Sequence, residues 1–281
     1  MTTYTTLISA AELQQLQRDG APLVVLDCGF DLSDPAAGER AHAAGHLPDA
    51  VYASLDNDLS GARSGRNGRH PLPQRAGFAR RAGEWGIAPG VQVVCYDAHG
   101  SPYAARAWWL LRWLGHRTVA VLDGGVGAWR DAGGAMSTAR PDTRPREPYP
   151  ADSEPAMPTL DADAVAAALG RRPVVDARAA DRFRGDLEPL DPVAGHIPGA
   201  VNRFFKDNLR PDGRFKPVAD LQADFAALGA PATSVIHQCG SGVTACHNLL
   251  AMEHAGLRGS ALYPGSWSEW CADPSRPVAQ G

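Results

Sequence analysis

The chain contains an internal repeat, and this feature constrains its architecture most. The segment AGHLPDA at residues 44–50 returns as AGHIPGA at 194–200, with five of seven positions identical and an offset of 150 residues. Three further matches follow the same order: LVVLD with PVVDAR, VQVVCYD with TSVIHQC, and LDGGVGAW with YPGSWSEW. Four matches in one order indicate a duplication. A chain of 281 residues is therefore expected to form two similar domains.

Each copy alternates short runs of Val, Ile and Leu with helical stretches such as 104–114 and 243–255. This alternation predicts an α/β fold, with a mainly parallel sheet and helices on both of its faces. Six prolines and several charges at residues 139–158 indicate an extended linker. The predicted organisation is a domain at 1–138, a linker at 139–158 and a second domain at 159–281.

The composition narrows the functional classes. With 44% hydrophobic and 21% charged residues, the chain is typical of a soluble globular protein. A net charge of −4 supplies no bulk positive field for nucleic acid or an anionic membrane, so neither is an expected partner. No apolar stretch approaches the roughly 20 residues that span a bilayer, and the N-terminal sequence lacks a signal-peptide pattern. A cytoplasmic location is expected.

Among five cysteines, Cys239 stands out. The odd number, without a CxxC pair or metal-like Cys/His spacing, argues against disulfides and structural zinc. Cys239 ends a strand-like run, opens a glycine-rich loop and precedes a helix predicted to be amphipathic, so backbone N–H groups can favour its thiolate. The first copy has Asp97 there, which leaves only the second copy able to act through a thiol. The others are expected to be buried packing residues: Cys28, Cys95, Cys246 and Cys271.

On these residues the chain resembles the tandem-domain rhodanese family of sulfurtransferases, over essentially its whole length. The resemblance rests on the duplication, the GH(I/L)P motif in both copies, the CGSGVTAC segment at 239–246 and the C-terminal GSWSEW. It implies two rhodanese-like domains, of which the first is non-catalytic. The loop CGSGVTA is similar to that of the 3-mercaptopyruvate branch, whereas the thiosulfate branch typically has basic residues directly after the cysteine.

The resemblance also implies a reaction and its residues. Cys239 accepts a sulfur from 3-mercaptopyruvate, a small-molecule donor, as a persulfide, and a thiol, cyanide or thioredoxin-like acceptor then removes it. No metal or organic cofactor is expected. Ser241, His70 and Asp56 are the residues that manage protons by this resemblance. The remaining loop residues are expected to surround the substrate: Gly240, Gly242, Val243 and Thr244.

A donor carboxylate needs a cation, ideally a guanidinium that grips both oxygens. By resemblance Arg182 is the substrate-binding arginine, and Arg178 and Arg184 are further possible ligands. Animal members of the mercaptopyruvate branch carry a second arginine nine residues later, where this chain has Asp191. Candidates to replace it are Arg184 and the basic residues of one loop, Arg63, Arg66 and Arg69.

The histidines of the two GH(I/L)P motifs, His46 and His196, occupy equivalent positions although only one copy carries the thiol. This symmetry favours a structural role, with a hydrogen bond that anchors the turn, over a catalytic one.

Three alternatives accompany the mercaptopyruvate assignment. Thiosulfate is an alternative donor, although Gly240 and Ser241 compensate a dianion less than basic side chains would. A non-catalytic rhodanese-like binding module is a remote alternative, because Cys239 is retained. A phosphatase is equally remote, because its loop ends in a phosphate-binding arginine and this loop closes at Ala245.

Overall fold

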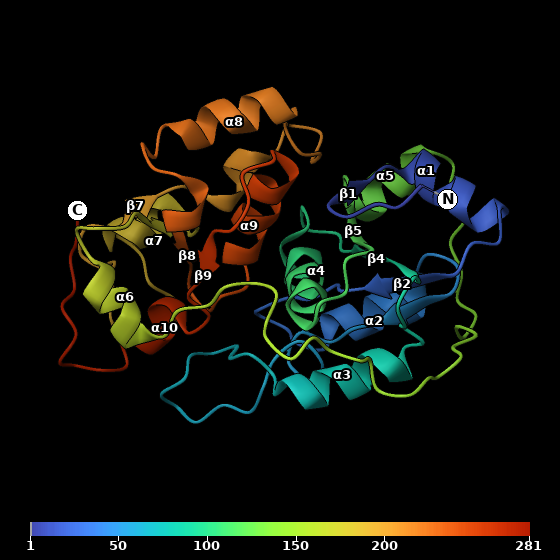
Figure 1. Ribbon diagram of the computed structural model, residues 1–281, viewed down its shortest axis with the longest axis horizontal. Coiled ribbons are helices and arrows are strands. Elements are labelled where there is room, and N and C mark those ends of the chain that lie inside the picture. Colours follow the sequence, from blue (N-terminus) through green and yellow to red (C-terminus); the bar gives the residue numbers. More distant parts are fainter. Residues whose placement is uncertain (1) are drawn as a thin grey trace. The chain divides into compact units, whose positions relative to one another are not determined.

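The computed structural model describes residues 2–281, which form two compact units (Figure 1). The first unit holds the chain up to Gly61 together with Pro73–Ala156 and Pro211–Phe215. The second holds Ala62–Leu72, Met157–Arg210 and Lys216–Gly281. Residues 139–158 contain no helix or strand, but most of them cluster with the first unit. The clustering thus follows packing, whereas the boundaries at 138 and 159, drawn from the repeat, stay a prediction.

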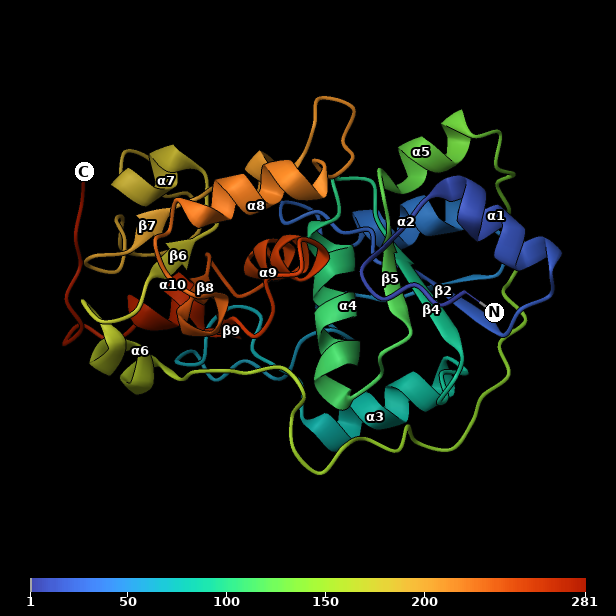
Figure 2. The ribbon, with the colours of Figure 1, turned by 45° about the horizontal axis from the view of Figure 1, so that its top comes forward.

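The first unit is built on a parallel sheet with the order β1-β5-β4-β2-β3. Its strands are β1 (Leu7–Ile8), β2 (Leu23–Asp27), β3 (Ala50–Tyr52), β4 (Gln92–Tyr96) and β5 (Val119–Leu122). Its helices are α1 (Ala10–Arg18), α2 (Ala37–Ala44), α3 (Arg75–Glu84), α4 (Pro102–Leu114) and α5 (Gly125–Asp131). Leu13 of α1 and Trp129 of α5 share a buried cluster with Val94 and Ala120 of the sheet. Figure 2 shows α4 on the opposite side of these strands.

The second unit repeats this plan with the sheet order β7-β6-β8-β9, again parallel. Its strands are β6 (Val174–Asp176), β7 (Val201–Asn202), β8 (Ile236–Gln238) and β9 (Ala261–Leu262). Its helical segments are α6 (Ala162–Ala168), α7 (Ala180–Arg184), η1 (Phe205–Asn208), α8 (Val218–Ala226), η2 (Ala232–Ser234), α9 (Ala245–His254) and α10 (Ser266–Trp270). Val165 of α6 and Trp267 of α10 pack with Ile236 of the sheet. The predicted α/β fold with two parallel-sheet domains is confirmed.

The helix after Cys239 differs from its prediction. It was expected over 243–255, but α9 begins at Ala245, because the preceding residues form the loop around the cysteine. The prediction that this helix is amphipathic is also wrong. Every residue from Ala245 to Met252 is buried, since α9 contacts β8 and β9 as well as α8 and η1.

The two motif histidines anchor chain segments, as predicted. His46 bridges to Ser137 through backbone hydrogen bonds, and its ring nitrogens lie 2.8 Å from the His42 carbonyl and 3.0 Å from that of Ala139. In the second unit His196 bridges to Ala279 in the same way, with Nδ1 2.8 Å from the Phe183 carbonyl. The same structural use in both units confirms the structural role.

Asp97 fills the loop of the first unit with its own negative charge. One carboxylate oxygen accepts the N–H groups of His99 and Ser101 at 2.8 and 2.9 Å, and the other accepts those of Tyr103 and Ala104 at 3.0 Å each. Burial raises the pKa of this carboxyl, and the N–H bonds oppose that rise. The loop that follows β4 therefore closes around an anion.

Replacing Asp97 by alanine should lower the free energy of unfolding by about 2–4 kcal/mol, because four N–H groups, two of them buried and two part-buried, lose their acceptor. Urea denaturation followed by circular dichroism measures this. Asp131→Ala, at an exposed aspartate of the same unit, is the control and should change stability by less than about 0.5 kcal/mol. Equal stability of the two variants would contradict the role of Asp97 as the acceptor that holds this loop.

No helix among residues 2–281 is long and apolar enough to cross a membrane.

Candidate active site

Cys239 lies directly after β8, in a loop that leads into α9. The Gly242 N–H donates to Cys239 Sγ over 3.1 Å, and the Cys239 N–H donates to Ser266 Oγ over 3.1 Å. The first N–H groups of α10 hold the loop from behind, since Trp267 N–H donates to the Cys239 carbonyl and Ser268 N–H to that of Gly240, both at 2.9 Å. The sulfur thus has a fixed position and a backbone donor that stabilises negative charge on it.

Two glycines shape this loop in different ways. Gly242 has φ +76°, and a Cβ there would lie 2.3 Å from the Pro264 carbonyl oxygen. Only glycine adopts this conformation and tolerates this approach at little cost. A Cβ at Gly240 would instead lie 2.8 Å from Arg69 Nη2 and 3.4 Å from Arg182 Nη1. The absence of a side chain at position 240 leaves that space to two guanidinium groups.

Ser241 and His70 meet in the second unit. His70 Nδ1 lies 2.8 Å from Ser241 Oγ, and the two residues are 2% and 6% exposed. His70 belongs to the loop 62–72, which comes from the first repeat but clusters with the second unit. The structure therefore brings together three of the predicted residues, Cys239, Ser241 and His70, in one unit.

Asp56 lies in the first unit, in a turn after β3, and is half-buried. Its assignment to the proton-handling group stays a prediction.

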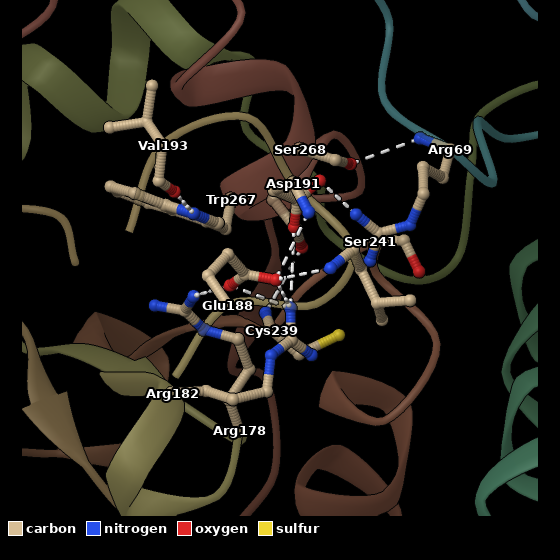
Figure 3. Close-up of polar contacts among 12 residues, drawn as sticks. Arg69, Arg178, Arg182, Glu188, Asp191, Val193, Cys239, Ser241, Trp267 and Ser268 are labelled. Atoms are coloured by element: carbon tan, nitrogen blue, oxygen red, sulfur yellow. Dashed lines mark hydrogen bonds and ion pairs between the residues drawn. The ribbon is translucent and has the colours of Figure 1, made fainter. Parts of the chain in front are cut away.

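Arg182 projects from the short helix α7. Its Nη2 donates to both carboxylate oxygens of Glu188, at 2.7 and 2.9 Å, and lies 3.4 Å from Asp191 Oδ2. Its Nη1 faces Gly240, as the distance above shows. Arg182 is thus oriented by two carboxylates and directed at the loop of Cys239 (Figure 3).

The two other arginines of this segment have their shortest contacts away from Gly240, although Arg178 also lies 3.4 Å from Glu188. Arg178 is buried, with Nε 3.0 Å and Nη2 2.7 Å from Asp176 Oδ2, and its guanidinium lies 4.9 Å from the centroid of the Trp267 ring. Arg184 pairs with Asp186 over 2.8 Å at the surface, with half of its side chain exposed. Neither contact directs a guanidinium at Gly240, so Arg182 is the arginine of this segment that the structure places there.

The structure adds one basic and two acidic residues to the site. Arg69 forms an ion pair with Asp191, which also contacts Arg182, so Asp191 lies between the two guanidinium groups (Figure 3). Glu188 pairs with the same Nη2 atom of Arg182 and also with Arg178. Arg69 was one of three candidates in its loop, and nothing in the sequence singled it out. Asp191 stood out in the sequence only as the position of a missing arginine, and Glu188 carried no signal beyond being acidic.

The other cysteines fit the prediction of buried packing residues. All five cysteines, each within the described residues, are buried and outside any disulfide. Burial raises the pKa of the Cys271 thiol to about 11 and that of Cys28 well above its ordinary value. Cys246 donates to the Gly242 carbonyl over 3.3 Å. Within residues 2–281, no group of three or more His, Cys, Asp or Glu side chains is arranged to hold a metal ion.

Comparisons with known proteins identify the family of the chain. The model of the rhodanese-like domain matches residues 9–132 and again 161–273. A relative from Pseudomonas aeruginosa, named probable 3-mercaptopyruvate sulfurtransferase, is 47% identical over 98% of this chain and 100% of its own. A relative from Mycobacterium tuberculosis, named putative thiosulfate sulfurtransferase SseB, is 40% identical over 98% of this chain and 97% of its own.

A solved structure has the same fold. The 3-mercaptopyruvate sulfurtransferase from Leishmania major superposes with a TM-score of 0.83 and 29% identity, over 95% of this chain and 74% of that one. Two matches of one domain model, relatives of the same length and a common fold confirm the resemblance seen in the repeat and the cysteine loop. The chain belongs to the rhodanese family of sulfurtransferases.

Proposed function

We propose that this chain transfers a sulfur from 3-mercaptopyruvate to a thiol, cyanide or thioredoxin-like acceptor, through a persulfide on Cys239. The observation that carries the donor assignment is the contact between Ser241 Oγ and His70 Nδ1, at 2.8 Å. Ser241 lies two residues after the cysteine. The relative named probable 3-mercaptopyruvate sulfurtransferase, at 47% identity, supports the same donor.

In the first half-reaction the Cys239 thiolate attacks the sulfur of the donor. A sulfur–sulfur bond forms and the carbon–sulfur bond breaks, with its electron pair passing to carbon 3 to give the enolate of pyruvate. The proton of the donor thiol must reach that carbon to complete pyruvate. A hydroxyl and an imidazole in hydrogen-bond contact can carry it, which is the role that we assign to Ser241 and His70.

In the persulfide Cys239 Sγ is neutral and the negative charge lies on the outer sulfur, one bond beyond it. The Gly242 N–H, 3.1 Å from Cys239 Sγ, and the neighbouring loop amides stabilise this charge. In the second half-reaction the acceptor attacks the outer sulfur, and the Cys239 thiolate is released for the next cycle. A small-molecule donor and acceptor are sufficient for this chemistry. A cytoplasmic location, with neither nucleic acid nor membrane as partner, stays a prediction from charge and hydropathy.

Thiosulfate is the second candidate donor, and one observation favours it. Arg69 and Arg182 both lie beside the position of a side chain on residue 240, so two guanidinium groups supply the loop with donors that its own residues lack. Sulfite would then be the leaving group. A dianion gains more from two cations than a monoanion does, and the relative from Mycobacterium tuberculosis has a thiosulfate name.

Steady-state kinetics with both donors and cyanide as acceptor tests the assignment. We expect kcat/KM for 3-mercaptopyruvate to exceed that for thiosulfate by at least about tenfold, because only the first reaction uses the proton relay. Pyruvate release and thiocyanate formation measure the first reaction, and thiocyanate formation alone measures the second. A clear preference for thiosulfate would replace the first candidate with the second.

A further inference from the structure

We propose that Arg69 is the second donor-binding residue of this site and forms, with Arg182, a two-guanidinium clamp for the carboxylate of the donor. The inference rests on the proposed function, since it assigns a residue to the anionic end of the same donor. Arg69 reaches the site from the loop 62–72, about 170 residues before the cysteine loop that it faces.

The position of the two guanidinium groups carries the proposal. A Cβ built on Gly240 would lie 2.8 Å from Arg69 Nη2 and 3.4 Å from Arg182 Nη1. The two side chains therefore converge on one point of the backbone, at the residue directly after Cys239. A carboxylate bound above Gly240 would have a guanidinium on each side, which is the arrangement that recognises planar anions best.

The hydrogen bonds of the clamp leave donors for a ligand. Nη1 of Arg69 donates to Asp191, and Nη2 of Arg182 donates to Glu188 and Asp191. The Nε atoms of Arg69 and Arg182 are buried without a hydrogen-bond partner in the described chain, 2–281. The atoms that face Gly240, Nη2 of Arg69 and Nη1 of Arg182, are not the ones held by Asp191 and Glu188, so they can donate to a bound carboxylate.

The loop holds Arg69 in this place. Its backbone N–H donates to Ser268 Oγ over 3.0 Å. The preceding Gly68 has φ +81°, and a Cβ there would lie 2.7 Å from the Gly265 carbonyl oxygen. The loop is thus fixed against the start of α10, which also holds the Cys239 loop, so one short helix positions both the thiol and the clamp.

Binding of pyruvate, the carboxylate product, tests the clamp directly by calorimetry, and steady-state kinetics with the mercaptopyruvate donor test it in turnover. Arg69→Gln should raise both the Kd for pyruvate and the KM for the donor about 10- to 100-fold, with a smaller effect on kcat. Arg69→Lys keeps the charge without the fork, so the increase should be only about three- to tenfold. The rate at which the neutral reagent iodoacetamide alkylates Cys239 should be the same within about twofold in Arg69→Gln and in the protein without the substitution, because the thiol loop is unchanged.

Arg66→Gln, at an exposed arginine of the same loop, is the matched control and should leave Kd and KM unchanged. The proposal is overturned if Arg69→Gln binds pyruvate and 3-mercaptopyruvate as tightly as Arg66→Gln does. Should Arg69→Gln not fold, Arg69→Lys decides, and an unchanged KM and Kd for that variant overturn the proposal. If the unmodified protein turns over neither donor, the proposed function fails, whereas the pyruvate measurement still tests Arg69 separately.

Discussion

Replacing Cys239 by serine should reduce sulfur transfer from either donor on the order of 10⁴-fold or more, because the attacking nucleophile is lost. The loop should survive the change, since its backbone contacts to Ser266, Trp267 and Ser268 do not involve the sulfur. Mass spectrometry of the intact protein, after treatment with donor in the absence of acceptor, gives a second measurement. The unmodified protein should gain about 32 Da, the mass of one sulfur, and Cys239→Ser should gain nothing.

Cys271→Ser is the matched control for this experiment. Burial raises the pKa of Cys271 to about 11, so this residue stays a thiol at neutral pH and should take no part in the transfer. The control should therefore keep its activity and still gain one sulfur. If Cys239→Ser gains the sulfur as well, another cysteine is the nucleophile and the proposed site is wrong.

The second large effect is expected at the serine that contacts His70. Ser241→Ala removes one member of the proton relay, so 3-mercaptopyruvate turnover should fall by about 10²- to 10³-fold. Thiosulfate turnover should fall by less than about tenfold, because sulfite leaves without a proton on carbon. The ratio of kcat values for the two donors, measured before and after the substitution, reports this difference.

The double variant with His70→Asn tests whether the pair acts as a unit. If it does, the second substitution adds little to the loss caused by Ser241→Ala, since groups in one relay are strongly non-additive. Equal losses with both donors would contradict the proton role of Ser241 and would indicate a general effect on the loop instead.

Much of the fold followed from local patterns in the sequence. Parallel strands end at the same edge of their sheet, so a cysteine after the strand that became β8 had to open a loop at that edge. The repeat then distinguished Cys239 from Asp97 at corresponding positions. The strand and loop predictions depended on neighbours within about ten residues, where spacing and residue type are informative, and the duplication added the comparison between the two copies.

The clamp depended on contacts that the sequence does not encode locally. Arg69 contacts Asp191 and faces Gly240 because the loop 62–72 packs within the second unit, and no periodicity reports such a long-range contact. The position of Asp191 first indicated a missing cation. In the structure the Asp191 carboxylate pairs with Arg69. The residue that replaces the second arginine therefore orients another arginine. The prediction that α9 is amphipathic was wrong for a related reason. Its outer face is covered by α8, and the sequence of α9 does not report that contact.

The Asp97 loop and the Cys239 loop, which occupy corresponding positions in the two copies, differ in how their N–H groups find an acceptor. In the first unit the four N–H groups have a permanent, covalently attached partner, so folding alone completes their hydrogen bonds. Under the proposed mechanism, the corresponding loop of the second unit surrounds a cysteine sulfur that gains and loses an outer sulfur in every cycle, so no single partner can be optimal throughout. The loop of the first unit thus keeps an arrangement of N–H groups that binds an anion, and the Asp97 carboxylate occupies it. The second unit has no such permanent carboxylate, so donor treatment that leaves an anionic sulfur bonded to Cys239 should raise its melting temperature, because the loop N–H groups gain an acceptor.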